Sequence, residues 1–340
     1  MSSSQTIFSG KESSDLIRSR SCPSCYLCGS RGEVLHENLE DRLFGAPGTW
    51  NLKRCPDRAC GLVWLDPMPL EEDIGKAYKN YYTHANCPAN RNDSKGKEFV
   101  RSLLVHAHDL LLRTILVDRE RRRLDVMYLE QNTPGKLLDV GCGDGSRLAR
   151  MRALGWEVMG QEVDFAAAFH ARSAYGLPVR VGSLEEAKFP DASFDAIIMN
   201  HVIEHAHDPV GLLTECRRVL KVGGTCVAVT PNVEGYGYRR SGPCWRGLEP
   251  PRHIHLFSQK TLVQVARKAH FDTINTWTTV ANAGSFMCGT LRIRLGEQTH
   301  ETFLSRMMGG ISITAYEVWI ALVHLANEDS GEECVLLAAK

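Results

Sequence analysis

The chain has 340 residues, of which 43% are hydrophobic, and its 40 basic residues balance its 40 acidic ones. A neutral chain of this length can bury one large core or two smaller ones, and it lacks the positive charge that disposes a protein to grip nucleic acid. Twelve cysteines in so long a chain do not indicate a small disulfide scaffold; they favour a reducing compartment with a metal site, and we expect a cytoplasmic protein.

The first 20 residues are rich in serine and charge and contain no apolar run. They do not have the pattern of a secretory signal, and we expect residues 1–20 to form a disordered tail. No stretch of about 18 apolar residues occurs in the sequence, so we expect no membrane span.

Two pairs of cysteines stand in residues 21–69, and each pair closes with a glycine. Glycine permits the sharp turn that two thiolates need in order to hold one metal ion, and four thiolates in two such turns form a closed, tetrahedral, structural zinc site. The predicted ligands are Cys25, Cys28, Cys55 and Cys60.

Cys22 is a rival ligand, because it precedes Cys25 at the same spacing that separates Cys25 from Cys28. The glycine after Cys28 favours the pair formed by Cys25 and Cys28. On either side of the second pair, residues 50–55 and 61–65 have the composition of short strands.

Residues 70–132 form a connector that we expect to be largely helical. Apolar residues recur at helical spacing from 99 to 131, and Thr133-Pro134-Gly135 then breaks the pattern. Four arginines between 119 and 123 fit a solvated helix face, and a contact with nucleic acid or anionic lipid is the alternative.

The stretch from Lys136 to Ser146 has the pattern of a buried parallel strand, a glycine turn and a helix start. Asp139 lies among the apolar residues of the strand, and three glycines follow at alternate positions, Gly141, Gly143 and Gly145. Such a turn lets the backbone approach a ligand closely, whereas the null hypothesis is an ordinary strand-to-helix turn. A dinucleotide fingerprint would require its third glycine at the position of Ser146.

Further strands alternate with helices after this turn. Glu162 ends the second strand, 23 residues after Asp139, where a carboxylate can accept hydrogen bonds from both hydroxyls of a ribose. Asn200 and His201 follow the fourth strand, at the carboxyl edge of the sheet, where ligands bind in such folds.

The chain resembles the class I S-adenosylmethionine (SAM) methyltransferases. The resemblance rests on Asp139 with its glycine turn and, more specifically, on the run from Phe194 to Asn232. It implies an α/β fold with a seven-stranded Rossmann-like methyltransferase sheet over residues 133–340, in which the last strand runs antiparallel between the fifth and the sixth. The cysteine-rich head resembles the small N-terminal four-cysteine zinc ribbon of a subset of these enzymes, and the connector is expected to cap the cofactor pocket.

The resemblance implies SAM as the cofactor, a ligand with an amino-acid end and a ribose but no pyrophosphate. Asp139 could face its ammonium group directly or through water. Ser183 stands where the family often has an acid for the adenine amino group, so this contact must be weaker, come from the Leu184 backbone or shift to Glu185. The expected cofactor-binding residues are Asp139, Gly141, Gly143, Gly145, Glu162, Ser183, Leu184, Asn200 and His201.

His201, Glu204 and His205 also match the His-x-x-Glu-His pattern of inverted zinc peptidases. That chemistry needs both histidines on one face of a regular helix, whereas this segment directly follows a buried strand. We therefore expect Glu204 to tie the loop down. The alternative is a divalent ion, which some ubiquinone-pathway O-methyltransferases with a similar segment use.

Residues 235–251 predict a long irregular loop that lines a substrate pocket, with Tyr236, Tyr238, Trp245 and Arg246 as candidates. His253 or His255 is the candidate general base for an acceptor hydroxyl, and the null hypothesis is a histidine that only hydrogen-bonds the loop. Residues 281–331 predict an insertion of helices that covers the substrate side or makes a homodimer contact.

The resemblance implies transfer of a methyl group from SAM to an oxygen, nitrogen or carbon nucleophile. We expect O-methylation of a small metabolite or saccharide. One alternative is an RNA methyltransferase whose ribbon grips its substrate, which a basic ribbon face would support and the neutral chain disfavours. Another is a non-catalytic protein that uses the SAM fold for binding or as a scaffold.

Overall fold

The computed structural model describes residues 16–79, 116–296 and 303–340. Residues 1–15 of the expected tail and residues 80–115 of the expected connector lie outside the described part. The prediction of a disordered tail is wrong for its last residues, because Ser19 and Arg20 form a strand that pairs antiparallel with Met68–Pro69. The strands are β1 (Ser19–Arg20), β2 (Glu33–Leu39), β3 (Trp50–Arg54), β4 (Val63–Leu65), β5 (Met68–Pro69), β6 (Lys136–Val140), β7 (Glu157–Glu162), β8 (Val179–Val181), β9 (Phe194–Asn200), β10 (Leu220–Pro231), β11 (His255–Leu256), β12 (Thr273–Thr279) and β13 (Glu333–Ala339).

The helices alternate with these strands. The α-helices are α2 (Leu116–Asp125), α3 (Ser146–Ala153), α4 (Phe165–Tyr175), α5 (Pro209–Val219), α6 (Tyr236–Ser241), α7 (Gln259–Lys268), α8 (Ala283–Leu295) and α9 (Phe303–Ala326). The short 3-10 helices are η2 (Ile74–Tyr78), η4 (Ile203–His205), η5 (Gly242–Cys244), η6 (Arg246–Leu248) and η7 (Glu328–Ser330). Within the described residues, no helix is both long and apolar enough to span a membrane.

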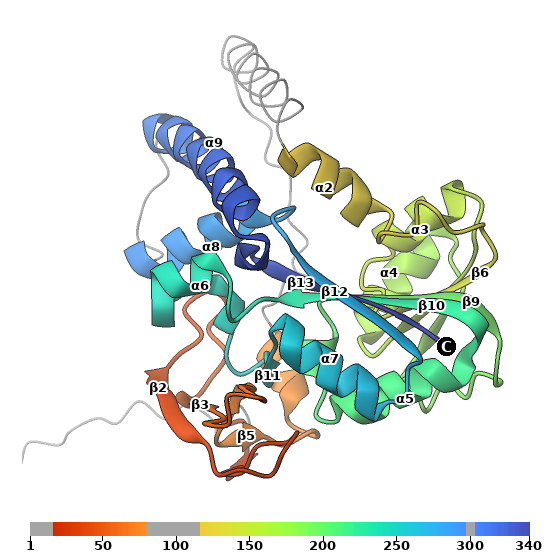
Figure 1. The fold of residues 1–340 in the computed structure, drawn as a ribbon, viewed down its shortest axis with the longest axis horizontal. Coiled ribbons are helices and arrows are strands. Elements are labelled where there is room, and N and C mark those ends of the chain that lie inside the picture. Colours follow the sequence, from red (N-terminus) through yellow and green to blue (C-terminus); the bar gives the residue numbers. More distant parts are fainter. Residues whose placement is uncertain (1–15, 80–115, 297–302) are drawn as a thin grey trace, which may run out of the picture.

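A seven-stranded sheet occupies the centre of the molecule in the order β12-β13-β10-β9-β6-β7-β8 (Figure 1). The neighbours from β10 to β8 are parallel, whereas β13 pairs antiparallel with both β10 and β12. The predicted α/β sheet and its antiparallel last strand are confirmed.

The sheet is buried on both faces, as its apolar strands predict. Leu138 and Val140 of β6 belong to a core with residues of α5 and α7, whereas Leu137 packs in a second core with Leu148 of α3. Figure 1 shows α3 and α4 on one side of the sheet and α5 and α7 on the other. Side chains therefore cover both faces of the sheet, which leaves its carboxyl edge for ligand binding.

β10 begins at Leu220, directly after α5, and passes through a register shift before Thr225. One segment differs from its predicted form. The expected irregular loop over 235–251 contains α6 and two 3-10 helices. Elements of three to six residues are too short to show a helical period. The segment expected to be a helical insertion, residues 281–331, contains α8 and α9.

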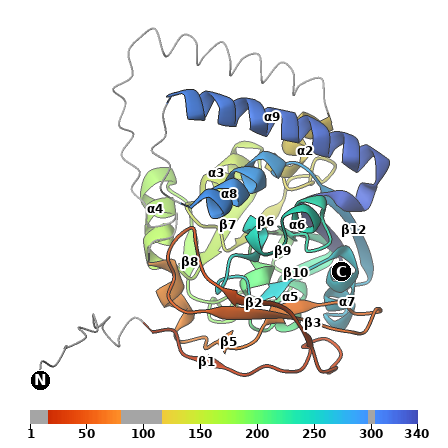
Figure 2. The same ribbon diagram turned by 90° about the vertical axis from the view of Figure 1, so that its left-hand side faces the viewer.

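The N-terminal ribbon shares a sheet with the C-terminal half of the chain. Its strands β2, β3 and β4 are joined by β11, which pairs antiparallel with β4. Figure 2 shows the ribbon strands on the side of the molecule opposite to α9. The ribbon is therefore built into the fold and is not a freely tethered module.

Arg252 fixes the ribbon and the connector against the larger part of the chain. Its side chain is fully buried, and Nη1 donates to Asp41 Oδ2 at 2.9 Å and to the backbone oxygen of Ala77 at 2.8 Å. Its Nε donates to Glu249 Oε1 at 3.1 Å. Removing one partner of such a buried pair costs about 3–5 kcal/mol, so this network holds three segments in one arrangement.

Candidate cofactor site and metal centre

The glycine turn after β6 leaves open space at its middle residue. All three glycines have positive φ, at 66° for Gly141, 54° for Gly143 and 81° for Gly145. A Cβ atom at Gly141 would lie 2.6 Å from Val202, and one at Gly145 would lie 2.7 Å from Ala171. At Gly143 it would meet no atom within 4 Å. The outer glycines therefore serve close packing, and Gly143 faces a free volume.

Glu162 lies beside this turn, as its position at the end of the second strand predicts. Its Oε2 accepts a hydrogen bond of 2.7 Å from the amide of Gly143, and Oε1 accepts one of 2.9 Å from the amide of Asp164. Burial raises the pKa of this carboxyl, although both hydrogen bonds oppose the shift. The structure thus brings together the acid and the glycine turn.

Asp139 completes the acidic side of the site. Its side chain is only 2% exposed, and burial raises its pKa to about 7 against the opposing charge of Arg147. A cationic ligand group nearby would hold the carboxylate in its charged form.

Asn200, the last residue of β9, and His201, which follows it, stand at the same carboxyl edge. Asn200 Oδ1 is buried and has no hydrogen-bond partner among the described residues. His201 binds Glu204 Oε1 through Nδ1 at 3.1 Å and Glu333 Oε1 through Nε2 at 2.7 Å. Burial alone would lower the pKa of His201, but the two carboxylates raise it to about 10, so the ring is charged at neutral pH.

Ser183 and Leu184 follow β8 at this edge, but each already has a local role. The amide of Ser183 donates to Glu186 Oε2 at 2.8 Å, and its hydroxyl accepts from the amide of Glu186 at 3.1 Å. The side chain of Leu184 is buried in the core, 2% exposed. The backbone oxygen of Ser183 also accepts from the amide of Ala187 at 3.0 Å, so the polar groups of Ser183 are engaged within the loop.

A ligand with an ammonium group and a ribose fits this edge. The buried Asp139 suits the cation, Glu162 suits vicinal hydroxyls, and the free volume at Gly143 admits a ligand close to the backbone. The unpartnered oxygen of Asn200 supplies another acceptor. These acceptor groups and the free volume therefore fit SAM.

Glu204 ties down the loop after β9, as expected. It is fully buried, and its oxygens accept from His201 Nδ1 and from Thr230 Oγ1 at 2.8 Å. The segment forms only a three-residue 3-10 helix, which cannot carry the two histidines of a peptidase site. Glu204 also has ligand atoms of His205 and His253 within 4.8 Å.

Both candidate general bases are buried and contact backbone oxygens. His255 is fully buried in β11, beside the ribbon, where Nδ1 contacts the backbone oxygen of Ala206 at 3.1 Å. Nδ1 of His253 contacts the backbone oxygen of Gly247 at 2.7 Å. Burial lowers the pKa of each to about 4. These contacts fit the null hypothesis, in which the histidines hydrogen-bond the loop.

Sequence reasoning missed Glu333, the second partner of His201. The two residues are 132 positions apart, and Glu333 opens an ordinary apolar strand. No local pattern signals such a pair, because only the insertion of β13 beside β10 brings it together.

The four predicted zinc ligands lie together in the ribbon. Their Sγ atoms are all within 4.8 Å of one another, with 3.6 Å between Cys25 and Cys60 and 3.3 Å between Cys28 and Cys55. Tetrahedral Zn–S bonds of about 2.3 Å place sulfur atoms about 3.8 Å apart, so the four thiols fit a zinc ion. Cys22 lies outside this group, and its amide donates to Asp66 Oδ1 at 2.7 Å.

Comparisons with known proteins agree with this geometry. Residues 114–276 match the family described as a methyltransferase domain. A relative from Mycolicibacterium smegmatis, named a probable S-adenosylmethionine-dependent methyltransferase, is 31% identical over 48% of this chain and 63% of its own length. A ubiquinone biosynthesis O-methyltransferase from Cereibacter sphaeroides is 29% identical over 44% of this chain and 66% of its own length.

This chain thus spans less than two thirds of the length of these relatives. A solved protein from Thermotoga maritima is described as a SAM-dependent methyltransferase and possible histamine N-methyltransferase. It aligns over 72% of this chain and 97% of its own, with 19% identity and a TM-score of 0.45. Residues 114–276 thus match a methyltransferase domain, and the strand order and the carboxyl-edge site agree with that match.

Proposed function

We propose that the protein transfers the methyl group of SAM to an oxygen of a small-molecule acceptor. The observation that carries the proposal is the pairing of two buried carboxylates, Asp139 and Glu162, with a glycine turn that faces free volume at Gly143. This combination suits a ligand that has both an ammonium group and a ribose.

Each residue of the edge has a defined task in the proposal. Glu162 accepts hydrogen bonds from the ribose hydroxyls, and Asp139 neutralises the ammonium group. Asn200 offers its unpartnered oxygen to the ligand. SAM supplies an activated methyl group on a sulfonium, so the chain chiefly aligns the reactants and excludes water.

Two observations support a small acceptor methylated on oxygen. Relatives named ubiquinone biosynthesis O-methyltransferases match nearly half of the chain. The ribbon, residues 21–69, has five basic and six acidic residues, so it lacks the net positive charge that would support RNA binding. We assign the four clustered thiols a structural zinc ion that stabilises the ribbon.

The test is to incubate the purified protein with SAM bearing an isotopically labelled methyl group and a metabolite extract, and to follow the label by mass spectrometry. We expect a labelled ether or ester and stoichiometric S-adenosylhomocysteine. SAM binding without methyl transfer to any acceptor would favour the scaffold alternative. Label that appears only when RNA is supplied would instead favour the RNA methyltransferase.

A further inference from the structure

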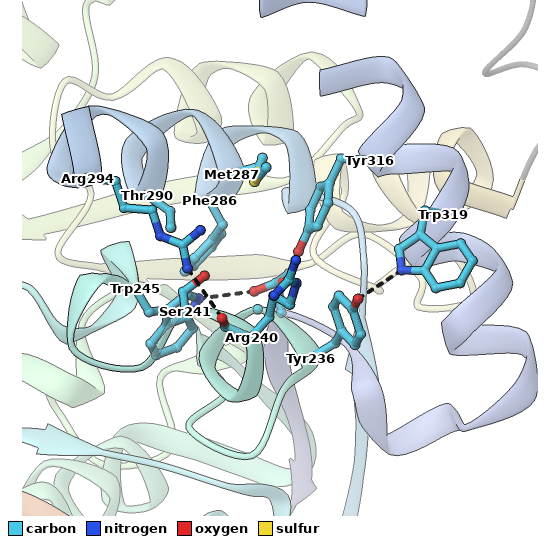
Figure 3. A pocket seen from close by; sticks show the side chains of 12 residues that line it. Tyr236, Arg240, Ser241, Trp245, Phe286, Met287, Thr290, Arg294, Tyr316 and Trp319 are labelled. Atoms are coloured by element: carbon cyan, nitrogen blue, oxygen red, sulfur yellow. Dashed lines mark hydrogen bonds between the residues drawn. The ribbon is translucent and has the colours of Figure 1, made fainter. Parts of the chain in front are cut away.

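A cavity of about 300 Å³ lies between α6, α8 and α9, beside the carboxyl edge of the sheet (Figure 3). The fully buried Glu332, just before β13, contributes to its lining. The next residue, Glu333, binds His201 at the end of β9. The ring of Phe286, on the cavity wall, has its centroid 6.3 Å from that of His201. The cavity therefore adjoins the edge assigned to the cofactor.

Aromatic side chains form much of the cavity wall. Trp245 and Phe286 stack with centroids 5.6 Å apart and an interplanar angle of 23°. Trp319 Nε1 donates to Tyr236 Oη at 3.0 Å. Figure 3 shows Tyr316 between this pair and the pair formed by Trp245 and Phe286. Flat apolar walls of this kind suit the face of a sugar or an aromatic ring.

Two arginines from different helices line the same cavity. Figure 3 shows the side chains of Arg240, from α6, and Arg294, from α8, directed into the space between these helices. In the part of the chain that the structure describes, neither forms an ion pair; Arg294 Nη2 donates to the backbone oxygen of Arg240 at 3.2 Å. Basic residues are favourable in the last turn of any helix, but that preference does not explain why both guanidinium groups meet at one cavity.

The carboxyl group of Glu332 does not neutralise these arginines. Its oxygens accept from Tyr316 Oη at 2.5 Å and from Trp245 Nε1 at 3.1 Å, so it holds the aromatic walls in place. Burial raises its pKa to about 7, and its charge at neutral pH is therefore incomplete. The cavity keeps an excess of positive charge at its arginines.

We propose that this cavity binds the methyl acceptor, and that the acceptor is a single-ring molecule bearing a carboxylate or a phosphate. Arg240 and Arg294 bind the anionic group, because a guanidinium fork matches the geometry of both anions. The ring lies against the aromatic wall. The inference rests on the proposed function, since it names the acceptor class of that enzyme.

The test uses calorimetry on the full chain saturated with S-adenosylhomocysteine, with probes that differ in the anionic group. Glucuronate and glucose 6-phosphate are compared with glucose, and 4-hydroxybenzoate is compared with 4-hydroxybenzamide. We expect at least one acidic probe to bind the wild type about tenfold more tightly than its neutral partner, a difference of about 1.4 kcal/mol. The glucuronate and phosphate arms distinguish the two anions.

The variant that carries both Arg240→Gln and Arg294→Gln should lose this preference while keeping its affinity for the neutral probes. Arg239→Gln is the matched control, because Arg239 is exposed on the same helix but does not line the cavity. This control should keep the wild-type preference for the acid.

Three results would overturn the inference: equal affinity for acidic and neutral probes, a preference that survives in the double variant, or no binding of any acidic probe at millimolar concentration. Affinity for S-adenosylhomocysteine is measured in the same samples. A wild-type protein that does not bind S-adenosylhomocysteine would contradict the proposed function itself. A wild-type protein that binds S-adenosylhomocysteine but shows no preference for acidic probes would contradict only the acceptor class.

Discussion

Glu162 and Gly143 are joined by a hydrogen bond of 2.7 Å, in which the amide of the glycine turn donates to the carboxylate at the end of β7. A second amide, that of Asp164 at the start of α4, holds the other oxygen. The carboxylate is therefore oriented toward the turn by the backbone alone. Such preorganisation lowers the entropic cost of binding a ligand.

Replacing Glu162 by Gln should weaken SAM binding, because the amide keeps the size of the side chain but loses the charge and one acceptor. Hydrogen bonds to charged groups contribute about 1.5–3 kcal/mol, so we expect affinity to fall about 10- to 100-fold. Isothermal titration calorimetry measures it. Glu157→Gln, at the exposed opposite end of β7, is the control and should bind normally; an equal loss in both variants would remove the role assigned to Glu162.

If the four clustered thiols bind zinc, replacing Cys55 and replacing Cys22 should have different effects on the zinc content of the protein. Cys55→Ser should lose most of its bound zinc and unfold at a lower temperature, because a structural zinc ion contributes directly to folding. Cys22→Ser should keep about one zinc ion per chain, since Cys22 lies outside the thiol cluster. Elemental analysis and thermal unfolding measure both. Loss of zinc from Cys22→Ser with retention in Cys55→Ser would contradict the assignment.

His201 should stabilise the fold in a pH-dependent way. Its pKa rises from 6.5 to about 10 in the folded chain, through Glu204 and Glu333. A raised pKa means that the stabilisation is complete below pH 6.5, declines as the pH rises, and is lost above about pH 10. The difference in unfolding free energy between wild type and His201→Gln should therefore shrink over this interval.

Urea unfolding at several pH values between these limits tests the prediction. His170→Gln is the control, because His170 is exposed on α4, and its effect should stay small throughout. A difference for His201→Gln that is constant or grows with pH would show that the ring does not carry the expected charge.

Features set by neighbouring residues could be predicted from the sequence. The strand around Asp139 and its glycine turn lie within one short stretch, and a strand-helix-strand unit of ordinary length brings Glu162 back beside the turn. The turns at the two cysteine pairs could also be predicted, because the glycine after each pair permits the turn. Gly29 and Gly61 both have positive φ.

Features set by distant residues could not be predicted in this way. Arg252 meets Asp41 across 211 positions, and nothing in either neighbourhood indicates the partner. His255, one of the two candidate bases, lies in a two-residue strand that completes the ribbon sheet. A strand so short has no period, so the sequence could not show which face its histidine would take.

If the glycine turn contacts bound SAM, a side chain introduced at Gly143 should obstruct the ligand. A Cβ at Gly143 meets no protein atom within 4 Å, and the same holds at Gly176, the C-cap of α4, which has φ of 60° against 54° at Gly143. Gly143→Val and Gly176→Val therefore impose similar backbone strain, but only the first places a side chain in the free volume beside Glu162.

The deciding measurement is calorimetric affinity for SAM in the wild type and in these two variants. We expect Gly143→Val to bind SAM at least about tenfold more weakly, a difference of about 1.4 kcal/mol, and Gly176→Val to keep wild-type affinity. Wild-type affinity in a folded Gly143→Val variant would contradict this expectation, because a ligand that lies on the turn could not share that space with a valine side chain.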